Sequence, residues 1–238
     1  KVNAFSFKNM NNLKYLYLSR NRIEVIETDA FYGLFNLMNL LIKENPIRVI
    51  ETCAFRGLPN VLDIELKNAN FGELNQSSLC GTESHLEYIE VYESNLTKVD
   101  PNTFVSFNSL LLIYLTENKN LRRISSNTFK NLPELRVLNL KKNRLNTIES
   151  FAFKNLTKLR FIDLTMNQLR SVEINSFSEL PPNISILLDY FHVSAVSLRP
   201  SHVRRHLISK LVELGNLKRY HKTKVLNIAY YKTVKLKN

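Results

Sequence analysis

Glycine, proline and long apolar runs are scarce in this sequence, and each scarcity excludes a class of structure. The 238 residues include five Gly and seven Pro, too few to mark a flexible linker between domains. No glycine-rich phosphate-binding loop is present. No stretch of 18 apolar residues occurs, so the sequence predicts no transmembrane segment. We therefore expect one continuous domain.

Motifs of catalytic chemistry are missing as well. No Ser, Cys or His lies in a recognisable nucleophile motif. His202 and His206 are four residues apart, as zinc ligands on a helix often are, but Arg204 and Arg205 between them disfavour a bound cation. The acidic residues are scattered and define no catalytic pair. We expect no metal and no cofactor, and we do not expect an enzyme.

What the sequence does contain is a repeated pattern, L-x-x-L-x-L-x-x-N-x-I/L-x-x-I, with Phe and Leu near the end of each unit. Successive units are 24 or 25 residues apart and begin at Leu13, Leu37, Val61, Leu86, Leu110, Leu135 and Leu159. A fixed period of this length indicates a repeat array, in which each unit buries its apolar face only by stacking on its neighbours. The alternating L-x-L core predicts one short strand in each unit.

Each column of the pattern has an expected place. The apolar strand residues should be buried, and they are Leu16, Leu18, Leu40, Ile42, Ile64, Leu66, Ile89, Val91, Ile113, Leu115, Leu138, Leu140, Ile162 and Leu164. An Asn after each strand can bond backbone groups as the chain turns. Ala69 and Ser94 replace it in repeats three and four, which predicts weaker turns there. Phe31, Phe55 and Phe153 should point into the core from the outer side.

The seven units, with their A-F-x-x-L outer segments, resemble the extracellular leucine-rich repeat family of animals, the 24-residue type. Toll-like receptors, glycoprotein-hormone receptors, Slit-like guidance proteins and adhesion proteins share this pattern. The resemblance implies an α/β-type solenoid, a right-handed horseshoe with a parallel concave sheet and an irregular or short-helical convex side. It also implies a protein-recognition module of a secreted or cell-surface receptor or adhesion protein. An intracellular leucine-rich repeat scaffold or adaptor is the alternative, and an enzyme is the third and least favoured.

We divide the chain at residue 198. Residues 1–198 form the predicted array, with a partial first repeat, seven full repeats and a degenerate last one. In the partial repeat, Phe7 and Met10 align with Phe31 and Leu34, so the chain is expected to start inside an array. The cysteine-rich cap with which the resembled family usually closes has no counterpart after the last repeat.

Residues 199–238 leave the pattern and carry much of the positive charge. Residues 181–238 contain 11 Lys and Arg against two acidic residues, whereas residues 1–180 contain 22 against 19. A helix over residues 202–214 is predicted from its apolar stripe, and residues 225–236 can form a strand. We favour the helix as a cap over the open end of the array, with polyanion contact and an unordered end as the alternatives.

The strand residues between the leucines should face the concave surface, where the central repeats are acidic and rich in tyrosine. The predicted ligand-binding residues are Tyr88, Glu90, Tyr92, Tyr114, Asp63, Glu65, Glu93 and Glu117. Tyrosine provides apolar area and a hydrogen-bonding tip at low entropic cost, as protein-binding surfaces need. The expected partner is a protein of basic or mixed charge. The alternative is that these side chains are simply those that any sheet facing water requires.

Cysteines and glycosylation sequons indicate whether the protein is located inside or outside the cell. Cys53 and Cys80 lie in the outer segments of adjacent repeats and either form a disulfide or remain buried thiols. Predicted N-glycosylation acceptors are Asn75, Asn95, Asn155 and Asn183. About four sequons would arise by chance in a chain this rich in Asn, but none lies in the outward-facing strand columns. We predict an extracellular or cell-surface location, with the cytoplasm as the alternative.

Overall fold

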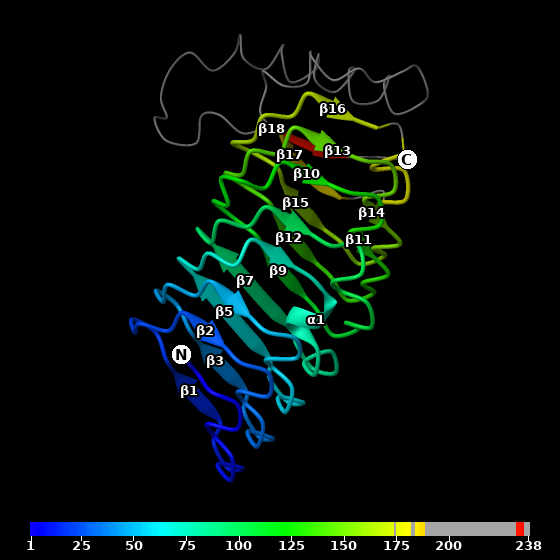
Figure 1. The fold of residues 1–238 in the computed structure, drawn as a ribbon. Coiled ribbons are helices and arrows are strands. Elements are labelled where there is room, and N and C mark those ends of the chain that lie inside the picture. The colour runs from blue at the N-terminus through cyan, green and yellow to red at the C-terminus, as the bar shows by residue number, and fades with distance from the viewer. Residues whose placement is uncertain (174, 182–183, 189–231, 236–238) are drawn as a thin grey trace, which may run out of the picture.

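The computed structural model describes residues 1–173, 175–181, 184–188 and 232–235, which form a curved stack of turns (Figure 1). One long sheet of nine strands runs the length of the stack, in the order β1-β3-β5-β7-β9-β12-β15-β17-β18. The first eight strands pair in parallel, one from each turn, and they are β1 (Tyr15–Tyr17), β3 (Asn39–Leu41), β5 (Asp63–Lys67), β7 (Tyr88–Tyr92), β9 (Leu112–Tyr114), β12 (Val137–Asn139), β15 (Phe161–Asp163) and β17 (Ser185–Leu188).

The last strand of this sheet comes from the basic C-terminal segment. β18 (Lys232–Lys235) pairs with β17 in antiparallel orientation, with Ser185 opposite Lys235. It lies inside the range 225–236 for which a strand was predicted. The predicted helix over residues 202–214 lies outside the described residues, and so do residues 189–198 at the end of the predicted array.

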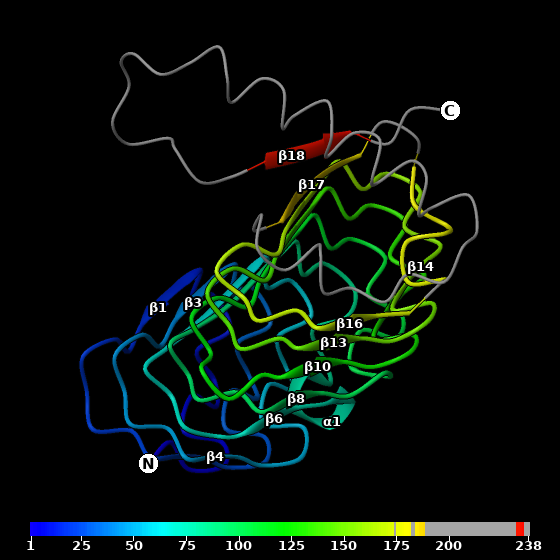
Figure 2. The same ribbon diagram turned by 90° about the horizontal axis from the view of Figure 1, so that it is seen from above.

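Small parallel sheets lie on the side of the stack opposite the long sheet (Figure 2). They pair β2 (Val25–Ile26) with β4 (Val49–Ile50), β6 (Glu73–Leu74) with β8 (Lys98–Val99), β11 (Phe129–Lys130) with β14 (Phe153–Lys154), and β10 (Arg123–Ile124) with β13 (Thr147–Ile148) and β16 (Ser171–Val172). One short helix, α1 (Gln76–Leu79), occurs in the outer segments that the structure describes, and the side chain of Asn75 caps its N-terminus. The predicted parallel-strand solenoid is therefore confirmed.

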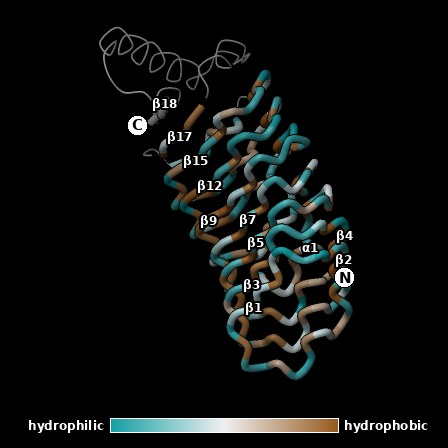
Figure 3. The backbone as a smooth tube through the Cα atoms, turned by 90° about the vertical axis from the view of Figure 1, so that its left-hand side faces the viewer, coloured by the Kyte–Doolittle hydropathy of each residue, from teal (hydrophilic) through white to brown (hydrophobic). Residues whose placement is uncertain are grey.

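The core lies between the long sheet and the outer segments, and the predicted strand residues fill it. Figure 3 shows hydrophobic positions recurring along the strands of the long sheet. Twelve of the fourteen are buried, each at most 1% exposed. The other two, Leu16 and Leu18, are half-buried instead, because β1 is an edge strand and has a neighbouring strand on one side. Period and strand alternation were enough to predict the remaining positions.

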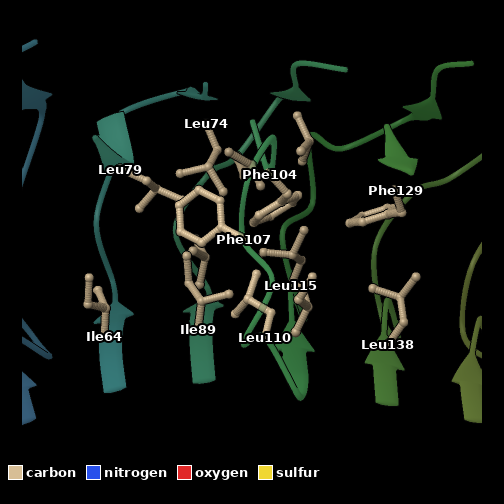
Figure 4. Packing of buried hydrophobic residues seen from close by; sticks show 14 of the residues in the cluster. Ile64, Leu74, Leu79, Ile89, Phe104, Phe107, Leu110, Leu115, Phe129 and Leu138 are labelled. Carbon is tan, nitrogen blue, oxygen red and sulfur yellow. The ribbon is translucent and has the colours of Figure 1, made fainter. Parts of the chain in front are cut away.

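Phenylalanine rings stack along the outer side of this core in two runs. One run is Phe7–Phe31–Phe55 and the other is Phe104–Phe129–Phe153–Phe177, with ring centroids 5.4 to 6.0 Å apart in neighbouring turns. Leu79, at the end of α1, interrupts the stack between them. Phe107 turns toward this place and meets Phe104 edge-on at 6.0 Å (Figure 4). An extra ring from the next turn therefore takes up space where the third turn has a leucine.

Asparagines at the predicted turn positions bond backbone groups of their own turn and of its neighbours. The Asn143 amide accepts a hydrogen bond from the Asn118 N–H at 2.8 Å and donates to the carbonyls of Leu115 and Leu140 at 2.7 Å. In the fourth repeat, Ser94 occupies the equivalent place. Its shorter hydroxyl donates to the Tyr92 carbonyl at 2.9 Å, lies 3.4 Å from the Leu66 carbonyl and accepts a hydrogen bond from the Ala69 N–H at 3.3 Å. A buried polar group thus still joins neighbouring turns here, through longer hydrogen bonds than those of Asn143.

Cys53 and Cys80 form a disulfide between the outer segments of the second and third repeats, with Cα atoms 5.0 Å apart. Of the two alternatives left open by the sequence, the structure therefore has the bonded pair. The disulfide lies beside the break in the phenylalanine stack, because Cys80 directly follows Leu79 and α1. Among the described residues, no helix has the length and apolar character to cross a membrane.

Candidate functional site

The register of the long sheet brings most of the predicted ligand-binding residues onto three neighbouring strands. On β5 and β7, Asp63 lies opposite Tyr88 and Glu65 lies opposite Glu90. On β9, Tyr114 lies opposite Glu90. Successive residues of a strand point to opposite faces, so these side chains share the face that is turned away from the core. All of them are half-buried.

Two carboxylates share one lysine at the centre of this face. Lys43 forms an ion pair with Glu65, and its Nζ lies 3.9 Å from Oε2 of Glu90. Partial burial raises the pKa of the Glu90 carboxyl, and a hydrogen bond to the neighbouring Glu65 adds to the increase. We call Asp63, Glu65, Tyr88, Glu90 and Tyr114 the acidic centre. Its carboxylates outnumber the cation beside them.

The tyrosines of the acidic centre form one packed pair. The rings of Tyr88 and Tyr114 meet edge to face, with centroids 5.6 Å apart. Partial burial and the nearby carboxylate of Glu90 raise the pKa of the Tyr88 phenol, so it stays a neutral hydrogen-bond donor. Burial and the charge of Glu65 also raise the pKa of Asp63, whose carboxylate accepts a hydrogen bond from the Asn39 side chain.

Tyr92 and Glu117 belong to a second group, at the other end of the strands. Lys67 Nζ lies 4.7 Å from the centre of the Tyr92 ring, and Lys142 Nζ donates to Glu117 Oε1 at 2.8 Å. This bond to Lys142 lowers the pKa of the Glu117 carboxyl. Burial and Glu117 together raise the pKa of Tyr92. The structure thus divides the predicted patch into two groups.

The predicted ligand-binding set leaves out the cations that face it. Lys43 contacts both Glu65 and Glu90, and Lys67 and Lys142 each contact one of the predicted residues. Glu93 is exposed beyond the end of β7 and lies close enough to Tyr92 for its charge to affect that phenol. The surface therefore has mixed charge with an acidic excess. No group of three or more His, Cys, Asp or Glu in the described part of the chain is placed to hold a metal ion.

The predicted glycosylation acceptors differ in their surroundings. Asn95 and Asn155 are exposed, and their amides donate to the side chains of Asn70 and Asn131, respectively. Asn75 is half-buried, and its side-chain oxygen accepts the Ser78 N–H at 3.0 Å as the cap of α1. Asn183 lies outside the described residues.

Family models match most of the described array. The model described as "Leucine rich repeat" matches residues 84–145 and 133–182. The model described as "BspA type Leucine rich repeat region (6 copies)" matches residues 1–110. These matches confirm the leucine-rich repeats that the sequence pattern indicates. No curated protein sequence matches the chain.

Two of the solved structures with the same fold are a bacterial and an insect protein. A leucine-rich repeat protein of Leptospira interrogans is 23% identical, with a TM-score of 0.63, over 86% of this chain and 48% of its own. A chain of the Toll–Spatzle complex of Drosophila is 20% identical, with a TM-score of 0.55, over 84% of this chain and 31% of its own. This chain thus spans half or less of either protein, and at these identities the likeness extends to the fold alone.

Proposed function

We propose that this chain, which belongs to the leucine-rich repeat proteins, binds a protein partner on the concave face of its long sheet, over the acidic centre and Tyr92. The observation that carries this proposal is the register of β5, β7 and β9. It gathers Tyr88, Tyr114 and an excess of carboxylate onto one rigid surface. Leucine-rich repeat domains are generally modules of protein interaction, which supports this use of the face.

The chemistry of this face suggests what the partner presents. Tyr88 and Tyr114 provide aromatic area with polar tips, which is typical of residues that dominate binding energy. The excess of carboxylates around Lys43 favours a basic or mixed-charge surface opposite them. Long-range attraction between opposite charges chiefly accelerates association, and buried aromatic contacts chiefly slow dissociation.

We further propose that the protein acts outside the cytoplasm, as part of a secreted or cell-surface receptor or adhesion protein. The Cys53–Cys80 disulfide supports this location, since such bonds persist in oxidising compartments. Exposed sequons at Asn95 and Asn155 also support it. Mass spectrometry of the protein secreted from animal cells measures both features. Glycan on both asparagines and an oxidised pair are expected, whereas an intracellular scaffold would carry neither.

Binding to an array of secreted and cell-surface proteins tests the proposed face, with affinities then measured by biolayer interferometry. The triple variant Tyr88→Ala/Tyr92→Ala/Tyr114→Ala is expected to lose at least about tenfold in affinity for any partner found. Tyr15→Ala/Tyr17→Ala is the matched control, because these tyrosines lie on the same sheet but at its N-terminal edge, 52% and 66% exposed. Unchanged binding by the triple variant would place the interface elsewhere.

A further inference from the structure

A second feature of the solenoid lies beside the long sheet, in the two turns that follow the acidic centre. A cavity of about 450 Å³ is lined by Arg136, Thr157, Lys158, Leu159, Arg160 and Pro181. Three of its six lining residues are cationic. Lys158 is bonded to Glu134 across one turn. Among the described residues, the guanidinium groups of Arg136 and Arg160 have no carboxylate partner, so the cavity has a net positive charge.

The two arginines occupy equivalent positions in successive turns. The Arg160 N–H donates to the Arg136 carbonyl at 2.9 Å, in a ladder that continues through the residue before each strand of the long sheet. In earlier turns this position is held by Lys14, Met38, Leu62, Glu87 and Leu111. Neighbouring parallel strands are about 4.8 Å apart. One carboxylate, or two successive acidic residues, can therefore contact both guanidinium groups.

The two arginines of the cavity directly precede strands of the long sheet. Arg136 is followed directly by Val137 on β12, and Arg160 is followed by Phe161 on β15. Val137 lies opposite both Leu112 and Phe161 in the sheet register. These three half-buried apolar side chains form a strip on the sheet beside the arginines. A ligand on this strip can thus place an anionic group in the cavity.

We propose that this cavity binds carboxylate side chains from an acidic, partly apolar segment of the protein partner. Arginine presents its N–H donors as a planar fork that matches a carboxylate with two parallel hydrogen bonds. The apolar strip provides contact area for the residues beside the acid. This inference rests on the proposed function, and it adds that the partner carries separate basic and acidic regions. The basic region faces the acidic centre and the acidic region faces Arg136 and Arg160, which fixes one orientation of docking.

A short fluorescein-labelled peptide tests the site without knowledge of the partner. It carries a Glu-Glu pair flanked by leucines, and binding to the full chain is followed by fluorescence anisotropy at low ionic strength. Arg136→Glu/Arg160→Glu is expected to weaken binding at least about tenfold. Arg136→Lys/Arg160→Lys is expected to weaken it several-fold, because the charge stays but the fork is lost. The same peptide with Gln-Gln in place of Glu-Glu is expected not to bind.

Lys8→Glu/Lys14→Glu provides the matched control, since it reverses the same number of charges and Lys14 holds the equivalent ladder position in the first turn. Its affinity for the peptide is expected to stay near that of the wild type. Equal losses in the two charge reversals would mean nonspecific attraction to a basic protein and would overturn the proposal. Undiminished binding by the Arg136→Glu/Arg160→Glu variant would also overturn it.

Anisotropy measurements with a sulfated oligosaccharide distinguish binding of peptide carboxylates from binding of polysaccharide sulfates. Arginine-dependent binding of the oligosaccharide, with none of the peptide, would assign the cavity to polysaccharide and overturn the proposal. The Tyr88/Tyr92/Tyr114 triple-alanine variant is expected to bind the peptide as the wild type does. The peptide result is therefore independent of whether a partner binds over the acidic centre. Thermal melting of each variant checks folding, and little change is expected because both arginines are exposed.

Discussion

Residues 69–104 and residues 143–177 build equivalent turns of the solenoid with different side chains. In the later region, buried Asn143 and Asn167 bond backbone groups of neighbouring turns, and the rings of Phe153 and Phe177 stack at 5.4 Å. In the earlier region, Ala69 and Ser94 replace the asparagines and Leu79 replaces the phenylalanine. The earlier region instead has the short helix α1, and Cys80 ties it to the preceding turn.

The difference shows which parts of the repeat can be exchanged. The strand column is buried in both regions, at Ile89 in the earlier and Ile162 in the later, because it forms the continuous part of the core. The turn and the outer segment vary where other side chains replace their contacts. Phe107 fills the volume beside Leu79, and the Cys53–Cys80 disulfide joins the two turns. The stability of residues 143–177 should therefore depend on stacked side chains, and that of residues 69–104 on a covalent link.

Phe153→Ala is expected to have the largest effect, a loss of about 3 to 5 kcal/mol in the free energy of unfolding. This ring lies between Phe129 and Phe177, at centroid distances of 6.0 and 5.4 Å, so its removal opens the stack on both sides. Leu79→Ala, at the interruption, is expected to cost less, about 2 to 3 kcal/mol. Urea denaturation measures both, and an equal or reversed order would contradict the distinction.

Cys53→Ser/Cys80→Ser is expected to cost about 2 to 4 kcal/mol, because the closed loop of 27 residues gains freedom mainly in the unfolded chain. Amide hydrogen exchange localises the effect. Residues 50–80 should exchange faster in the variant, whereas residues 143–173 should keep their protection. Uniformly faster exchange would mean that the array unfolds as one unit and that the two regions share their stability.

Glu90→Gln and Glu117→Gln are expected to have small and opposite effects at neutral pH, each less than about 1 kcal/mol. The pKa of Glu90 is raised in the fold by burial, so ionised Glu90 is unfavourable and stability falls as pH rises from about 4.3 through the raised pKa. The pKa of Glu117 is lowered by Lys142, so its contribution is present above about 4.3 and is lost as pH falls through the lowered pKa.

Glu90→Gln should therefore stabilise the protein at pH 7, and Glu117→Gln should destabilise it. Urea midpoints at pH 7 and at successively lower pH measure the difference, which should shrink as both carboxyls become protonated. Destabilisation by Glu90→Gln at neutral pH would show that its interaction with Lys43 outweighs the cost of burial.

The fold could be predicted from the sequence because the repeat period fixes both the strands and their order. The candidate site could be predicted in part, since the columns of Glu65, Glu90 and Tyr114 follow directly from that period. The division of the site into two groups could not be predicted from that period. Lys43 reaches Glu65 diagonally and Glu90 two turns away, and such contacts depend on side-chain conformations rather than on the column in which a residue lies.

The repeat period was also insufficient to predict that the two cysteines form a disulfide. They are 27 residues apart, whereas the repeats are 24 or 25 apart, so they do not share one column of the pattern. The path of the chain through α1 brings their Cα atoms to 5.0 Å. The sequence contained no signal for this local departure beyond the loss of the A-F-x-x-L motif in the third repeat.

The Cys53–Cys80 bond also determines how far the molecule can be extended by force. A solenoid whose turns contact only their neighbours comes apart turn by turn when its ends are pulled. The bond withholds the loop of 27 residues from this extension, which corresponds to about 90 Å of contour length. In an oxidising medium the protein is therefore a shorter tether than its residue count implies, and a reductant lengthens it by that one fixed step.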